Sequence, residues 1–417
     1  MTAARIEAVA IVAQGLACAT GLGLPALAAT VRSSASALRP NDITAVPLAA
    51  WIGRLEAIDG STLPPALAHW DGGGRHPLRA VRALLAAWLG LQADGFIVAV
   101  RAAVQRHGAT RVALVLGTST STIGASEAAY ARLAADGGFP APLRSERLNN
   151  LHAVTAFVQE ALALQGPCAT VSTACSSSAK AFAQAERWLR LGLADAVVVG
   201  GVDALCDSVL FGFAALGLVA NDPCRPFAAP HGKAGHGISV GEAAGFALLE
   251  RGPGALQLLG HGEANDAHHM STPHPQGLGA ERALDAALAR AGLAAEAVDY
   301  LNLHGTGTER NDAVEAALVA RRYRSDVHAS ATKGLTGHTM GAAGIVEALL
   351  CLLALRDGLC SGTAQSTVTD VALGPTFARQ LQLQPVQREP GRVQVAASHS
   401  FGFGGNNAVL LFGRGAP

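Results

Sequence analysis

The segment Val171-Ser172-Thr173-Ala174-Cys175-Ser176-Ser177-Ser178-Ala179 decides how the rest of this sequence is interpreted. A strand-like run, Ala169–Val171, leads into it, and an apolar helical pattern leaves it over Ala179–Leu191. Cys175 should therefore lie on a sharp turn at a helix N-terminus, where free backbone N–H groups and the helix dipole favour a thiolate over a thiol. Small neighbouring residues leave room for a substrate. Free cysteines are usually buried packing residues, so this segment alone leaves both a nucleophile and a structural cysteine open.

The rest of the chain alternates between strand-like and helical patterns, which indicates an α/β architecture. One strand ends and another begins around Glu250–Gly254, and this is the seam that we predict between two halves. The run Asp71-Gly72-Gly73-Gly74 is predicted to be a flexible surface loop. The strand-like runs are Val112–Leu116, Ala196–Val199, Phe246–Leu249 and Val393–Ala396, and a second helical pattern covers Ala280–Ala291.

The composition fits a large folded protein without an obvious polyanionic partner. The chain has 417 residues, of which 50% are hydrophobic and 15% charged, with 31 basic and 31 acidic side chains. This balance excludes a disordered chain and gives no sign of a nucleic-acid or anionic-membrane surface. The seven cysteines include no CxxC pair, so we expect reduced thiols in the cytoplasm.

An uncharged stretch from Ala8 to Val31 has the composition of a targeting or membrane segment. Gly15, Gly21, Gly23 and Pro25 interrupt it, however, and suit a membrane helix poorly. We therefore interpret it as a strand, a turn and a helix, and expect no membrane span.

Two histidines occupy Gly/Thr-rich loops that can point a ring into a cleft. His304 lies in Asn302-Leu303-His304-Gly305-Thr306-Gly307-Thr308, after the strand-like run Val298–Leu301. His338 lies in Lys333-Gly334-Leu335-Thr336-Gly337-His338, just before a predicted helix. A lone histidine is usually a packed or surface residue, but two such loops and an accessible cysteine together indicate a catalytic set.

Two further features of these loops bear on the chemistry. Lys333 is one of only three lysines, with Lys180 and Lys233, in a chain that otherwise uses arginine. Chance retention of Lys333 stays open. Asp312 and Glu309 near His304 leave a metal site open as well, but the wide spacing of the histidines argues against it, and we expect no metal. The pair His268-His269 is expected on the surface.

A glycine-rich loop, Ser400-Phe401-Gly402-Phe403-Gly404-Gly405-Asn406-Asn407-Ala408, follows one predicted strand and precedes another, Val409–Phe412. Because it does not lead into a helix, a phosphate loop is a poor fit. Glycines let a backbone approach a ligand closely. The loop can therefore be a wide hairpin turn, or it can supply an oxyanion-hole N–H group and an aromatic gate.

These motifs together resemble the β-ketoacyl carrier-protein synthases, the elongating condensing enzymes of fatty-acid and polyketide synthesis. The match consists of Thr-Ala-Cys-Ser-Ser, His-Gly-Thr-Gly-Thr, Lys-Gly-Leu-Thr-Gly-His and Gly-Phe-Gly-Gly, in the family's order and spacing. It implies a thiolase fold, in which two similar αβαβα halves form a five-layered core. We place the halves at residues 1–250, with the nucleophile, and 251–417, with both histidines.

The resemblance also implies the activity and the residues that carry it. The expected reaction is a decarboxylative Claisen condensation, catalysed by an acyltransferase-class enzyme, of an acyl thioester with a malonyl carrier protein. Cys175 would be acylated, and Cys175 and Phe403 would form the oxyanion hole, with Phe403 also acting as a gate. No cofactor is expected beyond the phosphopantetheine of the acyl carrier protein. The remaining expected site residues are His304, His338 and Lys333 as catalytic groups, Thr306, Thr308, Phe401 and Gly404 as phosphopantetheine-binding residues, and Glu347 as structural support.

The Cys–His–His set distinguishes the elongating type from initiating synthases and thiolases, and the presence of Cys175 distinguishes it from inactive chain-length-factor subunits. Two departures from the family pattern are Glu309-Arg310, where a proline is usual after the His304 motif, and a longer loop over residues 228–237. Trp51-Ile52-Gly53-Arg54, residues 116–121 and residues 237–245 resemble synthases of aryl-polyene and xanthomonadin-like pigments. Either a homodimer or a heterodimer with a chain-length-factor-like subunit fits. The alternatives are a partner-dependent subunit and an acyltransferase that forms an ester or amide.

Overall fold

The computed structural model describes residues 7–70, 82–139, 147–229 and 236–415. Its strands form two five-stranded groups with the same order, β6-β5-β7-β9-β1 and β12-β11-β15-β16-β10. A two-residue contact between β1 and β10 joins the groups into one sheet, from which β2 (Gly21–Leu22) branches. The strands of the first group are β1 (Val9–Cys18), β5 (Val112–Gly117), β6 (Cys168–Val171), β7 (Ala196–Asp203) and β9 (Ala243–Arg251), and those of the second are β10 (Leu256–Asn265), β11 (Tyr300–Leu303), β12 (His328–Ala331), β15 (Val395–Gly402) and β16 (Asn406–Arg414).

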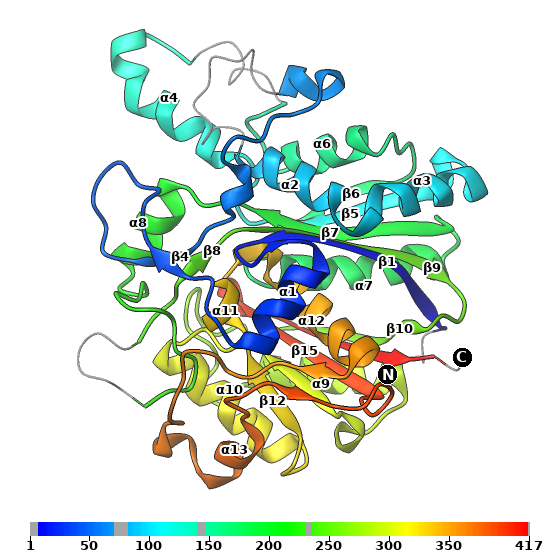
Figure 1. Ribbon diagram of the computed structural model, residues 1–417, viewed down its shortest axis with the longest axis vertical. Coiled ribbons are helices and arrows are strands. Elements are labelled where there is room, and N and C mark those ends of the chain that lie inside the picture. Colours follow the sequence, from blue (N-terminus) through cyan, green and yellow to red (C-terminus); the bar gives the residue numbers. More distant parts are fainter. Residues whose placement is uncertain (1–6, 71–81, 140–146, 230–235, 416–417) are drawn as a thin grey trace.

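The two groups match in direction as well as in order. In each, three strands run parallel and two lie antiparallel at the end where the groups meet. Figure 1 shows five layers, with helices outside each group of strands and α7 and α12 between them. The prediction of a thiolase fold with two similar halves is therefore confirmed. The boundary at residue 250 stays a prediction, and β9 crosses it by one residue.

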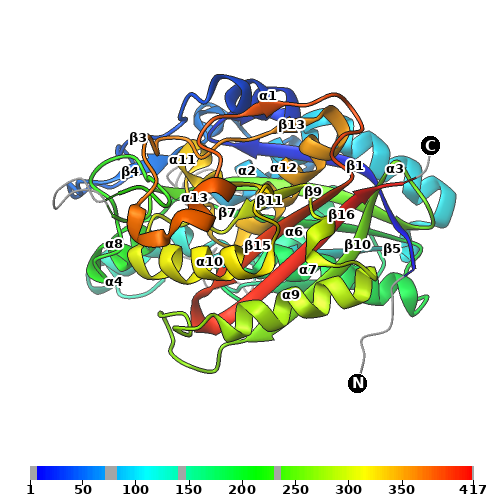
Figure 2. The ribbon, with the colours of Figure 1, turned by 90° about the horizontal axis from the view of Figure 1, so that it is seen from below.

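Helices form three layers, one between the two groups of strands and one outside each group. α7 (Ser177–Arg190) and α12 (Ala343–Asp357) form the central layer, and α12 is buried over nearly its whole length because it has almost no polar face. A side chain at Gly344 would begin 2.6 Å from the backbone nitrogen of Ala179, so the two helices can meet only at a glycine. The outer helices are α2 (Arg82–Gln92), α3 (Phe96–His107) and α6 (Ala153–Ala161) over the first group, and α9 (Leu278–Ala291), α10 (Glu309–Arg322) and α13 (Pro375–Gln380) over the second (Figures 1 and 2).

Smaller elements complete the described part of the fold. α1 (Gly23–Ser33) follows β1, as predicted for the uncharged N-terminal stretch. α4 (Ile123–Asp136) projects from the first half in Figure 1. The others are α8 (Asp207–Ala215), α11 (Lys333–Thr336), β3 (Arg39–Pro40), β4 (Trp51–Gly53), β8 (Val240–Gly241), β13 (Leu359–Cys360), β14 (Val386–Gln387) and several short 3-10 turns.

Most predicted elements lie where the sequence placed them, with shifts at their ends. The strands predicted at Val298–Leu301 and Val393–Ala396 begin two residues later, as β11 and β15. The predicted loop at Asp71–Gly74 lies outside the described residues, as does most of the 228–237 loop with Lys233. Among the described residues, one helical stretch, Arg82–His107, is long and apolar enough to span a membrane by length and composition alone. It is broken at Asp94, which has a φ of 55°, and 56% of its apolar window is buried in the protein.

Candidate active site

The nucleophile turn joins β6 to α7 and is held together by hydroxyl groups. Ala174 has a φ of 53°, which makes the turn sharp, and Cys175 follows it directly. Ser177 Oγ accepts the N–H of Thr173 at 2.9 Å and donates to the carbonyl of Ala174 at 2.6 Å. Ser176 Oγ donates to the carbonyl of Thr173 at 2.9 Å. The small serines that we expected to leave room for a substrate are thus buried and hold the turn.

Cys175 is more deeply buried than the sequence suggested, with 7% of its surface exposed. Burial raises the pKa of its thiol to about 11, although the Lys333 charge and the Phe403 N–H act in the opposite direction. The expectation of an accessible thiolate at rest is therefore wrong, because desolvation outweighs the favourable groups around the sulfur. The thiol is the resting form at neutral pH.

The glycine loop brings Phe403 to this sulfur. β15 ends at Gly402, Phe403–Gly405 form a 3-10 turn, and β16 begins at Asn406. A side chain at Gly402 would begin 3.1 Å from the backbone nitrogen of Cys175, so the close approach requires glycine. The backbone N–H of Phe403 lies close enough to the Cys175 sulfur to lower the pKa of its thiol. This position is the one that an oxyanion-hole donor needs.

His304 follows β11 and is fixed by a buried carboxylate. Glu315 on α10 accepts the backbone N–H groups of His304 and Gly305, each at 2.8 Å. His304 lines the cavity, as expected for a ring that points into a cleft, although it is only 2% exposed and most of its loop is buried. Its Nδ1 lies 3.4 Å from the Lys333 ammonium, which can only donate, so Nδ1 accepts and Nε2 carries the proton.

His338 lies between α11 and α12, and its tautomer is set in the same way. Its Nδ1 accepts the backbone N–H of Met340 at 3.1 Å, which leaves Nε2–H as the free donor. The two histidine rings are perpendicular, with centroids 5.5 Å apart. Burial and the positive charge of Lys333 hold the pKa of each histidine well below its usual value, so both are neutral at pH 7.

Lys333 and Glu347 form a buried ion pair behind these rings. Lys333 Nζ donates to Glu347 and to the carbonyl of His304. Burial raises the pKa of Glu347 to about 7, and Lys333 opposes that shift. Glu347, which we expected as structural support, thus pairs with Lys333, and the Lys333 side chain contacts His304.

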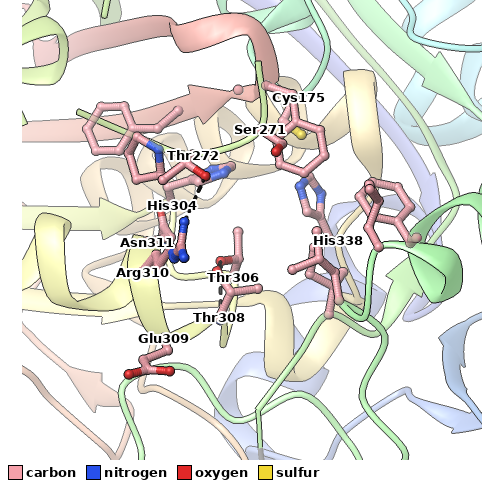
Figure 3. Close-up of a pocket in the computed structure, with 18 of the residues that line it drawn as sticks. Cys175, Ser271, Thr272, His304, Thr306, Thr308, Glu309, Arg310, Asn311 and His338 are labelled. Carbon is pink, nitrogen blue, oxygen red and sulfur yellow. Dashed lines mark hydrogen bonds between the residues drawn. The ribbon is translucent and has the colours of Figure 1, made fainter. Parts of the chain in front are cut away.

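Cys175, His304 and His338 converge on one cavity of about 460 Å³. Their ligand-type atoms lie within 4.8 Å of one another, a spacing at which a soft divalent cation would also find donors. Figure 3 shows Cys175 and His338 across the cavity from Glu309 and Arg310. Of the seven cysteines, Cys175 alone lines this cavity.

The predicted binding residues are only partly in this cavity. Thr306, Thr308, Phe401 and Phe403 line it, and the hydroxyls of Thr306 and Thr308 hydrogen-bond at 2.8 Å. Gly404 is exposed, does not line the cavity and faces the 265–270 loop, where its N–H donates to the carbonyl of Met270 at 2.6 Å. Residues that the sequence did not single out also line it, including Phe213, Ser271 and Thr272, and His268-His269 is exposed as expected. Phe213 lies on α8, and Ser271 and Thr272 lie on a loop, in segments without a recognisable motif.

Another unpredicted residue, Asp203, ties the two halves together beside the site. Asp203, at the end of β7, is fully buried and accepts hydrogen bonds from Ser119 and from the N–H of Gly341, at 2.7 Å. Gly341 lies three residues after His338. Asp203 therefore connects the loop after β5 to the loop that carries His338.

Comparisons with known proteins agree with this geometry. The β-ketoacyl synthase N-terminal domain matches residues 80–255, and the C-terminal domain matches residues 256–367. Nodulation protein E of Rhizobium meliloti is 36% identical over 320 residues, 73% of this chain and 76% of that protein. The 3-oxoacyl-[acyl-carrier-protein] synthase 2 of the same organism is 38% identical over 266 residues, 60% of this chain and 62% of that protein.

A solved structure extends the similarity to nearly the full chain. The ketosynthase ApeO of Xenorhabdus doucetiae, solved in complex with its chain length factor ApeC, is 32% identical with a TM-score of 0.84, and the match covers 98% of each chain. The ishigamide ketosynthase/chain length factor shares the fold, with a TM-score of 0.82 over 99% of this chain. The chain therefore belongs to the β-ketoacyl synthase family.

Proposed function

We propose that this protein elongates a carrier-bound acyl chain by decarboxylative condensation with a malonyl carrier protein. The observation that carries the proposal is the convergence of a cysteine thiol and two neutral histidines, within 4.8 Å of one another, at one cavity. A nucleophile beside two N–H donors suits a reaction that passes through a thioester and an enolate.

Acylation is the first half-reaction. The Cys175 sulfur attacks the carbonyl of the acyl thioester, the carrier sulfur leaves as a thiol, and the proton lost by Cys175 is balanced by the proton that the carrier gains. The N–H groups of Cys175 and Phe403 hold the tetrahedral oxyanion. Lys333 and the Nε2–H groups of the histidines favour the developing negative charge on a sulfur that is neutral at rest.

Condensation is the second half-reaction. The malonyl carrier loses CO₂, and the resulting enolate oxygen accepts Nε2–H donors from His304 and His338, which are the free donors in the tautomers that their hydrogen bonds assign. The enolate carbon attacks the acyl-cysteine, a carbon–carbon bond forms, and the Cys175 sulfur leaves and takes a proton from water. The products are a β-ketoacyl carrier and CO₂. We propose that no resident cofactor takes part, since these groups suffice for every step.

Three features support the carrier, the partner and the pathway. Thr306 and Thr308 line the cavity where a phosphopantetheine arm would pass. β6 is an edge strand that pairs only with β5 among the described strands, and its residues are half-exposed, as suits a second synthase subunit. The similarity to ApeO and the three pigment-type segments favour an aryl-polyene pathway.

The seven cysteines, all without disulfides, suit the cytoplasm.

The test separates condensation from the alternatives. The pure protein is given malonyl carrier alone, then acyl carrier as well, and CO₂, acyl-enzyme and β-ketoacyl carrier are measured. A β-ketoacyl product from this chain alone supports the proposal. Product only after addition of a second synthase subunit indicates the partner-dependent form. Acyl-enzyme that forms only esters or amides would contradict condensation.

A further inference from the structure

The turn that carries Phe403 is held by three asparagines at consecutive carbonyls. Each carbonyl from Phe403 to Gly405 accepts a hydrogen bond from an asparagine Nδ2 group, which fixes the backbone of the turn. The bonds are Asn406 to the Phe403 carbonyl at 3.2 Å, Asn265 to the Gly404 carbonyl at 2.8 Å, and Asn407 to the Gly405 carbonyl at 3.1 Å.

Asn406 is held in turn by a lysine on the nucleophile helix. Lys180 Nζ donates to Asn406 Oδ1 at 2.9 Å, which aims the Asn406 Nδ2 group at the Phe403 carbonyl. Lys180 lies on α7, five residues after Cys175, and does not line the cavity. It is half-buried, and burial lowers its pKa, so its placement has an energetic cost that a solvated lysine would avoid.

These contacts connect the oxyanion donor to the nucleophile through one helix. The residue before Phe403, Gly402, packs against the backbone of Cys175, and the Phe403 N–H lowers the pKa of the Cys175 thiol. The Phe403 carbonyl accepts a hydrogen bond from Asn406, which in turn accepts one from Lys180. We propose that Lys180 is a positioning residue for the oxyanion hole, acting through Asn406 to hold the Phe403 N–H over Cys175. The inference rests on the proposed function, in which that N–H stabilises the tetrahedral oxyanion.

If Lys180 positions the oxyanion hole, its loss should slow acyl transfer and leave malonyl decarboxylation almost unchanged. Acyl transfer forms an oxyanion at the Phe403 N–H, whereas loss of CO₂ from malonyl carrier places its negative charge at the two histidines, which Lys180 does not contact. Loss of a whole oxyanion donor costs about 100- to 1,000-fold in rate, so a displaced donor should cost about tenfold. A general loss of folding would instead lower both half-reactions together.

The variants are Lys180→Met, Lys180→Arg, Asn406→Ala and the Lys180→Met/Asn406→Ala double variant, with Arg190→Met as the matched control. Arg190 lies on the same helix and pairs with Glu186, away from the turn. Acylation rate, malonyl decarboxylation rate and melting temperature are measured on each. We expect both single losses to slow acylation about tenfold with decarboxylation within about twofold of wild type, Arg to restore most of the rate, and the double variant to be no slower than the slower single one. Equal losses in both half-reactions, additive losses in the double variant, or no loss would overturn the inference.

Alkylation of Cys175 by iodoacetamide tests the same contact without any carrier substrate. The Phe403 N–H lowers the pKa of the Cys175 thiol, so displacing it should move the alkylation midpoint to higher pH. Asn406→Ala keeps the Lys180 charge, and Lys333, Glu347 and Asp203, which also act on the thiol, are unchanged, so a shift in this variant reports the turn. If wild type accepts no acyl carrier, the proposed function fails but the alkylation shift still tests the positioning. If wild type is active and the midpoint does not move, the positioning role is wrong.

Discussion

The two halves place different chemistry at the same point of the same topology. Cys175 follows β6 and precedes α7, and His338 follows β12 and precedes α12, in strand groups of identical order. In the first half, the hydroxyls of Ser176 and Ser177 hold the turn. In the second half, the charged side chains of Glu315 and Lys333 hold the His304 loop.

This difference follows from what each half must do. A nucleophile changes its charge during the reaction, and neutral hydroxyls fix its backbone without adding a field that favours one state. The histidines must remain neutral donors, and the Lys333 charge helps to keep their pKa values low. Both halves thus fix the position of a reactive side chain, while the second half also lowers the pKa of its histidines with a buried charge.

The largest expected effect comes from removing the nucleophile, which the first half supplies. Cys175→Ala should abolish acylation and condensation, by at least about 1,000-fold, because no other cysteine lines the cavity. The fold should survive so small a change. Intact-mass measurement after exposure to an acyl carrier checks this. An adduct on the variant, or on another cysteine of the wild type, would show that the nucleophile is misassigned.

Removing a histidine should affect the other half-reaction. His304→Ala and His338→Ala should each slow malonyl decarboxylation about 100- to 1,000-fold, since each removes one enolate donor, and should slow acylation of Cys175 less. Release of labelled CO₂ is compared with the size of the acylation burst. Decarboxylation at the wild-type rate in both variants would contradict the assignment.

A smaller effect, on pH dependence, should follow from loss of the buried cation. Lys333→Met removes a positive charge that lowers the pKa of both histidines, so these pKa values should rise toward 6.5 and the acid limb of decarboxylation should move to higher pH. The variant also leaves Glu347 buried without its partner, which costs about 3–5 kcal/mol of stability. A pH–rate profile and a melting curve measure both. An acid limb that does not move would show that Lys333 is structural only.

The sequence predicted the catalytic set better than its electrostatics. Strand and helix patterns placed Cys175, His304 and His338 at element ends, because periodicity and glycine mark such ends locally. Depth of burial depends on how the halves pack, so the thiolate expectation for Cys175 was wrong. The contacts of Asp203 and Lys180 join residues 138 and 226 positions apart, and no local pattern reports such a contact. Gly404 was misplaced for a related reason, since the motif did not show which side of the turn faces the cavity.

The last prediction concerns Phe403, whose backbone N–H serves acylation and whose ring lines the cavity in which condensation would take place. A core phenylalanine replaced by alanine costs about 3–5 kcal/mol and would depress every step through unfolding. Phe403 is half-exposed and lines the cavity, and its ring centroid lies 5.9 Å from that of Phe213, which also lines the cavity. The Phe403 ring can therefore move without opening the core. The asparagines that hold its carbonyl side restrict the backbone, and motion should therefore be mainly that of the side chain. We expect Phe403→Ala to melt close to wild type and still load acyl groups, because the N–H donor remains, but to lose condensation or the order in which the two carriers react. A melting curve with separate acylation and condensation assays on one preparation measures this, and a large fall in melting temperature with proportional loss of both half-reactions would assign Phe403 to the core.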